Sequence, residues 1–111
     1  MLRMGAIIVF CTVPDTATAG RIADALVAER LAACVNRLPG VASTYRWKEA
    51  IQHDDECLLL IKTTHERFES LRDRIVALHP YEVPEIVALN IEAGAAAYLD
   101  WIEAAVRIDV P

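Results

Sequence analysis

The sequence predicts an α+β fold in which a four-stranded antiparallel sheet has two helices on one face and a third helix after the last strand. Short segments that are apolar throughout, typical of buried strands, alternate with longer segments in which apolar residues recur every three or four positions, typical of helices. These segments follow the order strand, helix, strand, strand, helix, strand, helix. The 111 residues contain no repeat and no linker, which indicates one domain over residues 1–111.

The first strand and first helix are marked by a change of period. Ala6–Val13 is short, β-branched and continuously apolar, which predicts a strand covered on both faces. Asp15 is a good N-cap, and the three- and four-residue spacing after it predicts a helix from residue 16 to about residue 32.

The middle of the chain predicts a strand hairpin. Residues 33–47 have strand character, and Pro39-Gly40 should bend or bulge this long strand. The polar segment 48–55 is expected to form the tip of the hairpin. The chain then returns as the strand 57–61, which is too uniformly apolar to have a solvated face.

The second half begins with Thr63 and Glu66, whose spacing is that of a helix capping box. The helix that follows has one apolar stripe, made of Phe68, Leu71, Ile75 and Leu78. Residues 85–91 predict the fourth strand. Residues 94–106 predict the last helix, with a stripe made of Tyr98, Trp101, Ile102 and Ala105.

This order of elements is the ferredoxin-like plan, built from split βαβ units. Both helices lie on one face of its sheet, and the other face has no cover. Because the central strands are apolar on both sides, that face should be buried by the last helix, by other subunits, or by both. The apolar fraction of 55% supports this, since so small a domain buries only about 60 to 70% of its unfolded surface. We therefore expect a homo-oligomer.

Charge and hydropathy disfavour two kinds of partner. The net charge is −5, and the eleven Lys and Arg residues are scattered along the chain. A nucleic-acid partner requires a basic surface, so we expect none. No apolar run reaches the ~18 residues of a membrane span, so we expect no such span.

The N-terminal residues imitate a secretory signal, with Arg3, an apolar run and Ala17-Thr18-Ala19. Cleavage there would remove the first strand and cut the first helix, so we disfavour this interpretation. The cysteines are odd in number and form no C-x-x-C pair; they are Cys11, Cys34 and Cys57. This pattern fits reduced thiols, and we expect a cytoplasmic protein.

The segment 79–85, His-Pro-Tyr-Glu-Val-Pro-Glu, is the best candidate for a functional site. Its two prolines fix the backbone and force His79 out of the preceding helix. A rigid loop can hold an imidazole, a phenol and carboxylates at fixed separations. The alternative is a helix stop before a proline-started strand, with Tyr81 as a packing residue and the glutamates in solvent.

From about Val9 to Trp101 the chain resembles the CutA family of divalent-cation tolerance proteins. The matching motifs occur in the expected order; they are Cys11-Thr12-Val13-Pro14-Asp15, Leu31-Ala32-Ala33-Cys34-Val35-Asn36, Ser43-Thr44-Tyr45-Arg46-Trp47, Lys62-Thr63, the loop 79–85 and Tyr98-Leu99-Asp100-Trp101. The family is ferredoxin-like, assembles as a tight trimer resembling PII signalling proteins, and has members that bind copper. The resemblance therefore implies a homotrimer linked to metal tolerance. We do not expect an enzyme, because the sequence places no nucleophile beside a base.

The resemblance also implies a copper site. The family's described ligands are a cysteine and two successive histidines, and the matching residues here are Cys11, Leu78 and His79. Since Leu78 cannot bind a metal, we expect Cys11 and His79 to bind copper weakly and exchangeably. At the hairpin, Trp47-Lys48-Glu49-Ala50 replaces the family's Trp-Glu-Gly-Lys, so the glycine and the lysine are both absent.

The remaining candidates belong to subunit clefts and interfaces; they are Tyr45, Trp47, Lys62, Tyr81, Glu82, Pro84, Glu85 and Trp101. If Glu85 is buried, we expect it to pair with a donor such as Lys62. The alternative function is a PII-like regulatory module that holds a small anion or nucleotide against Lys62 and Arg46, although no glycine-rich phosphate loop supports it. A hydrolase is disfavoured, because no arginine-bearing phosphate loop follows the first strand.

Overall fold

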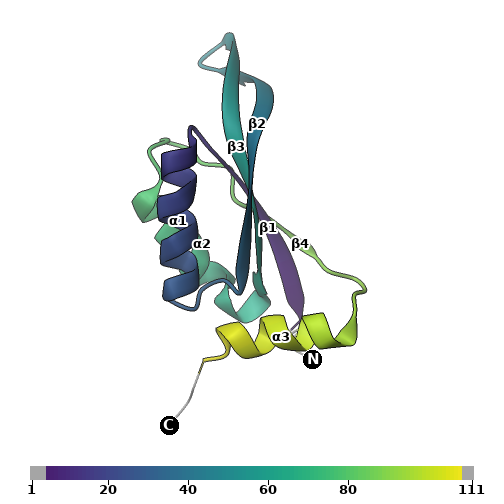
Figure 1. Ribbon diagram of the computed structural model, residues 1–111. Helices are drawn as coiled ribbons and strands as arrows, with labels where there is room; N and C mark the ends of the chain where they lie inside the picture. The colour runs from purple at the N-terminus through teal and green to yellow at the C-terminus, as the bar shows by residue number, and fades with distance from the viewer. Residues whose placement is uncertain (1–4, 109–111) are drawn as a thin grey trace.

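The computed structural model describes residues 5–108 and confirms the ferredoxin-like prediction (Figure 1). Its elements are β1 (Ala6–Val13), α1 (Thr16–Ala28), β2 (Cys34–Trp47), β3 (Ala50–Thr64), the 3-10 helix η1 (His65–Arg67), α2 (Phe68–Leu78), β4 (Val87–Asn90) and α3 (Ala96–Val106). The strands pair antiparallel in the order β2-β3-β1-β4. This order places the first strand of each βαβ half in the centre of the sheet.

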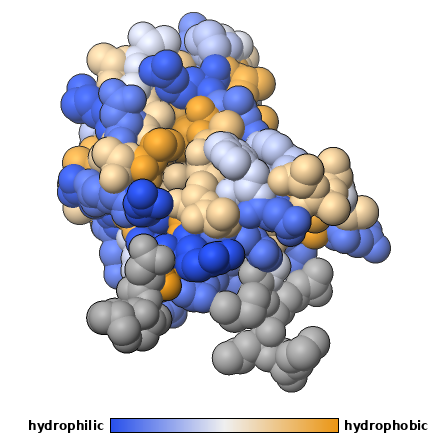
Figure 2. Space-filling view, turned by 60° about the horizontal axis from the view of Figure 1, so that its bottom comes forward, coloured by the Kyte–Doolittle hydropathy of each residue, from blue (hydrophilic) through white to orange (hydrophobic). Residues whose placement is uncertain are grey.

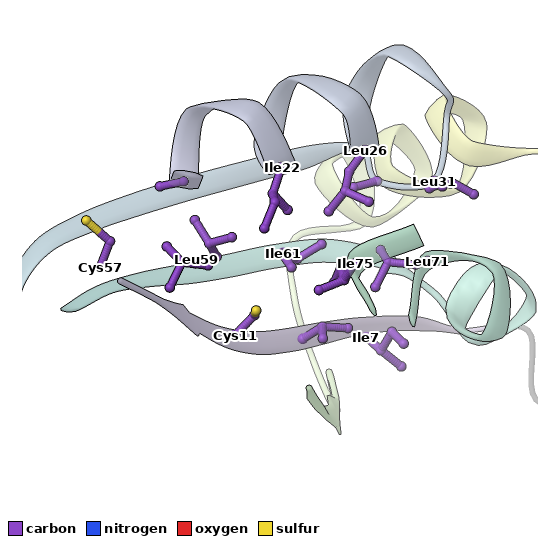
Figure 3. Packing of buried hydrophobic residues seen from close by; sticks show 14 residues of the cluster. Ile7, Cys11, Ile22, Leu26, Leu31, Cys57, Leu59, Ile61, Leu71 and Ile75 are labelled. Carbon is purple, nitrogen blue, oxygen red and sulfur yellow. The ribbon is translucent and has the colours of Figure 1, made fainter. Parts of the chain in front are cut away.

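The hydrophobic core lies between the sheet and the two helices α1 and α2, which cover the same face (Figures 1 and 3). Alternate residues of the central strands point toward these helices, because successive side chains of a strand lie on opposite faces. The buried side chains that meet there include Ile7, Val9 and Cys11 of β1, Leu59 and Ile61 of β3, Ile22 and Leu26 of α1, and Leu71 and Ile75 of α2. The predicted apolar stripe of α2 is thereby confirmed.

The predicted bend of β2 is a bulge. The pairing of β2 with β3 shifts register between Leu38 and Val41. Gly40 has a φ of 78°, a left-handed conformation that glycine adopts without steric cost.

The tip of the hairpin is shorter than predicted. Strands β2 and β3 pair as far as Trp47 and Ala50, so only Lys48 and Glu49 form the turn. Residues 50–55 therefore belong to β3, and the prediction that they form the tip was wrong. The hairpin extends beyond the helices (Figure 1), so its residues are mostly exposed and need no apolar side chains.

Glu49 is the position at which we expect a stabilising substitution. Both turn residues have positive φ, 50° for Lys48 and 67° for Glu49, as a two-residue hairpin turn requires. A non-glycine residue there costs roughly 1 kcal/mol, so Glu49→Gly should raise the free energy of unfolding by about that amount in urea titrations. Glu49→Ala, which keeps a Cβ, should give no such gain. An equal gain from both variants would show that the glutamate side chain, and not the backbone, causes the strain.

The helices are shorter at their ends than the sequence predicts. Helix α1 ends at Ala28, four residues before the predicted end, because Arg30 has a left-handed φ of 58° and the amides of Leu31 and Ala32 turn back to Leu26 O. The predicted capping box before α2 does not form. The Thr63 hydroxyl donates to Leu31 O at 2.7 Å and so helps to hold the loop after α1.

The last two elements also begin later than predicted. Strand β4 covers only residues 87–90 of the predicted 85–91, and α3 starts at residue 96 and not 94. The buried stripe of helix α3 consists of Ile102 and Val106, whereas Tyr98 and Trp101 of the predicted stripe are exposed. Within residues 5–108, no helix has the length and apolar character needed to cross a membrane.

The second face of the sheet remains largely uncovered. Strand register places apolar residues on this face, which we call the open face; they include Ile8, Phe10, Leu38, Leu58, Leu60, Val87 and Leu89. Helix α3 packs against β1 and β3 at one end of the sheet (Figure 1). Viewed from that end, hydrophobic residues gather in the centre among hydrophilic ones (Figure 2). Val87 and Leu89 are still 50% and 53% exposed, so α3 alone does not bury the open face.

Candidate functional site

His79 anchors the loop 79–85, which contains Pro80 and Pro84, to strand β1. It ends α2 in an extended conformation, as expected for a residue before proline, and its side chain is buried. Its ring Nε2 lies 2.8 Å from Thr12 O, and its Nδ1 accepts a hydrogen bond of 3.1 Å from the Tyr81 amide. These partners select the neutral tautomer with the proton on Nε2. Both ring nitrogens are therefore engaged.

Cys11 lies beside the same carbonyl group. Its thiol donates a long hydrogen bond of 3.8 Å to Thr12 O, and the residue is fully buried in the core (Figure 3). Burial raises the pKa of the thiol to about 12, and the carboxylates of Glu85 and Glu56 contribute to the rise. Cys11 and His79 thus hydrogen-bond to the same carbonyl oxygen, Thr12 O, and the raised pKa keeps the thiol protonated at neutral pH.

Tyr81 covers a buried carboxylate that the sequence analysis did not select. Its hydroxyl donates to Glu56 Oε2 at 2.7 Å, and its ring packs against His79 with centroids 4.7 Å apart. Burial, together with the bond to Glu56, raises the pKa of Tyr81. The even spacing of Glu56 from Leu58 and Leu60 was the available signal, because it places Glu56 on the same sheet face as these residues.

A hollow of about 640 Å³ lies beside this loop, and we call it the hairpin hollow. Its lining includes Tyr45 and Trp47 of β2, Glu56 of β3, and Tyr81, Glu82 and Glu85 of the loop. The Tyr45 hydroxyl hydrogen-bonds to Asp54. Five of the predicted cleft residues therefore share one cavity, whereas Pro84, Lys62 and Trp101 do not line it.

The other predicted residues lie elsewhere on the molecule. Trp101 stacks on Tyr98 of α3 with ring centroids 5.6 Å apart. Lys62 hydrogen-bonds to Asn36, because it lies opposite Cys34 on β2, two positions from Asn36. Glu85 is exposed in the described chain, so the burial on which its predicted pair with Lys62 depends is not met.

The residues that could hold a metal ion are few. Among residues 5–108, no group of three or more His, Cys, Asp or Glu side chains converges in a way that could hold one. The Cys11 and His79 pair supplies the sulfur and nitrogen donors that copper prefers. A bound ion would have to displace a hydrogen bond of His79 and the proton of Cys11.

The fold and the anchored loop define a ferredoxin-like protein of the PII-like kind, and comparison identifies its family. Residues 7–105 match the model of the CutA1 divalent ion tolerance proteins. The chain belongs to this family, as the sequence motifs predicted.

Individual relatives agree with this assignment. The chain is 56% identical over 95 residues to the divalent-cation tolerance protein CutA of Thermus thermophilus, covering 86% of this chain and 92% of that protein. It is 43% identical to the chloroplastic CutA of Arabidopsis thaliana, of whose length it spans 56%. The crystal structure of CutA1 from Oryza sativa superposes with a TM-score of 0.92 at 39% identity, covering 96% of this chain and 98% of that one.

Proposed function

We propose that the chain is a homotrimeric divalent-cation tolerance protein that binds copper or a similar ion weakly at Cys11 and His79. The observation that carries this proposal is the meeting of the thiol and the imidazole at Thr12 O. The two donors suit Cu(I) or Cu(II) better than Mg(II) or Ca(II). With only two side-chain ligands, the coordination must be completed by solvent or by a group from another subunit.

Copper titration under controlled redox conditions tests the site. We expect one ion per chain and at least a tenfold loss of affinity in Cys11→Ser and in His79→Ala, because each removes half of the ligand set. Leu78→His should tighten binding by adding a third ligand. Cys34→Ser serves as the control, since this half-buried thiol lies on β2 away from the loop. Unchanged affinity in both ligand variants would place copper binding elsewhere.

The open face supports the trimer. Its apolar residues are half-buried or exposed in the single chain, and exposing such a face costs free energy in proportion to its area. Light scattering coupled to size exclusion should give three times the chain mass of 12.3 kDa, and this mass should persist on dilution. A mass of one chain at micromolar concentration would contradict the proposal.

A second candidate function is a PII-like regulatory module that binds a small ligand in the clefts between subunits. The hairpin hollow favours it, because a cavity of this volume falls in the range of small-molecule sites. Binding scans with nucleotides and small acids separate the two functions, since a copper site would not respond to them. In both cases we propose a binding role, not catalysis.

We further propose a cytoplasmic location. The chain has three free cysteines, Cys11, Cys34 and Cys57, which persist most readily in a reducing compartment. Thiol alkylation of intact cells followed by fractionation tests this, and oxidised thiols in the native protein would count against it.

A further inference from the structure

The hairpin hollow is negatively charged on its lining. Glu56, Glu82 and Glu85 contribute carboxylates to it, and no Lys or Arg side chain of residues 5–108 does so. The ion pairs within residues 5–108 join Arg72 to Asp73 and Arg74 to Glu29, and none of these residues lines the hollow. The three carboxylates therefore have no cation of the described chain as a partner.

Glu56 is the carboxylate that most needs a further partner. It is 7% exposed, and a buried carboxylate is costly unless its oxygens receive hydrogen bonds or a cation. Among the described residues, Tyr81 donates to Oε2, whereas Oε1 has no protein donor and is not sealed from solvent. Since Glu56 lines the hollow, a cation there would complete its interactions.

The walls of the hollow are aromatic as well as acidic. Tyr45, Trp47 and Tyr81 line it together with Val83. Lys48 Nζ already lies 5.7 Å from the centroid of the Trp47 ring, which shows that a cation can approach this ring. Aromatic faces attract cations, and ammonium and guanidinium groups that carry apolar carbon satisfy such walls and the carboxylates together.

We propose that the hairpin hollow binds an organic cation, an alkylammonium or alkylguanidinium group, with Glu56 as its buried counter-ion. The cation belongs either to a free small amine or to a Lys or Arg side chain of a second copy of this chain. The inference rests on the second candidate function, in which the hollow is a ligand site. The ligand proposed here is a cation and not the small anion expected from the sequence. It is independent of copper binding at Cys11 and His79.

Titration of the intact protein with butylammonium and butylguanidinium, using butyrate as the anionic control, tests the proposal. The titration uses the Trp101→Phe background, in which Trp47 is the one remaining tryptophan, so the change in tryptophan fluorescence reports binding in the hollow. We expect the cations to bind and butyrate not to bind, with weaker cation binding at high salt. Glu56→Gln should weaken cation binding at least tenfold, and Glu69→Gln on the exposed surface of α2 should leave it unchanged. Glu82→Gln, at an exposed loop position that does not endanger folding, should weaken it several-fold.

The outcomes separate the two sources of the cation. Binding of the free cations that is lost in Glu56→Gln supports a small amine. If they do not bind, but Glu56→Gln raises the dissociation constant of the assembly at least tenfold while Glu69→Gln does not, the cation comes from a second copy. Absence of both effects overturns the proposal, as does butyrate binding equal to that of the cations. If the amines do not bind, binding of nucleotides would also overturn the proposal, and so would copper binding that depends on Glu56. Nucleotide binding would still leave the regulatory function standing.

Discussion

Ile75→Ala should lower the free energy of unfolding by about 2 to 5 kcal/mol, the range for truncating a fully buried aliphatic side chain. Ile75 of α2 is 0% exposed and belongs to the core between the helices and the sheet (Figure 3). Alanine removes three carbon atoms and leaves a cavity that tightly packed neighbours cannot fully close. Alanine's high helix propensity would offset only a few tenths of a kcal/mol.

Val76→Ala is the matched control, because it lies next to Ile75 on the same helix and is 54% exposed. We expect a change within about 0.5 kcal/mol there. Urea titrations at one protein concentration provide the measurement, since the stability of an oligomer depends on concentration. Equal losses at the two positions would contradict the burial pattern of α2 and indicate that its outer surface is also packed in solution.

The strands and the order of elements were predictable because the buried segments follow periods that the fold imposes. Ala6–Val13 is apolar at every position except Thr12, and its helix-facing residues alternate with open-face residues, as expected for a strand covered on both faces. The polar part of β3 was not predictable in this way. Residues 50–56 lie mostly on the protruding hairpin, where no core selects apolar side chains, so their polar character resembles that of a loop.

The ends of the helices depend on contacts that no local pattern records. Arg30 takes a left-handed conformation in place of glycine, and Thr63 bonds to Leu31 O, which is distant in sequence, and does not cap a helix. Local capping rules fail here because tertiary hydrogen bonds satisfy the same groups.

The candidate site was predicted in part. The loop 79–85 was selected because its prolines make it rigid, and His79 and Tyr81 do make specific contacts. Their partners, Thr12 and Glu56, come from β1 and β3, and only the folded sheet brings those strands beside the loop. A sequence pattern can therefore indicate which loop residues are available for contacts, but not which strand residues they contact.

The second large effect concerns alkaline pH and Cys11. The thiol of an unfolded chain ionises near its ordinary pKa of 9.0, whereas burial raises the pKa to about 12 in the folded protein. Between these values the folded state binds more protons than the unfolded state, so stability falls as the pH rises. The contribution of Cys11 is complete below about pH 9 and is lost at up to about 1.4 kcal/mol per pH unit, or roughly 2 to 4 kcal/mol by pH 12.

Cys11→Ala isolates this contribution from other groups that titrate at alkaline pH. At pH 8 the variant should be less stable than the wild type by about 1 kcal/mol, because the buried sulfur is lost. Between pH 9 and 11 the difference should shrink and then reverse, since alanine has no proton to lose. Cys34→Ala, at a half-buried thiol on β2, is the control and should follow the wild-type curve. Urea titrations under reducing conditions at several pH values give these curves, and parallel curves for wild type and Cys11→Ala would show that the Cys11 thiol ionises without cost in the folded protein.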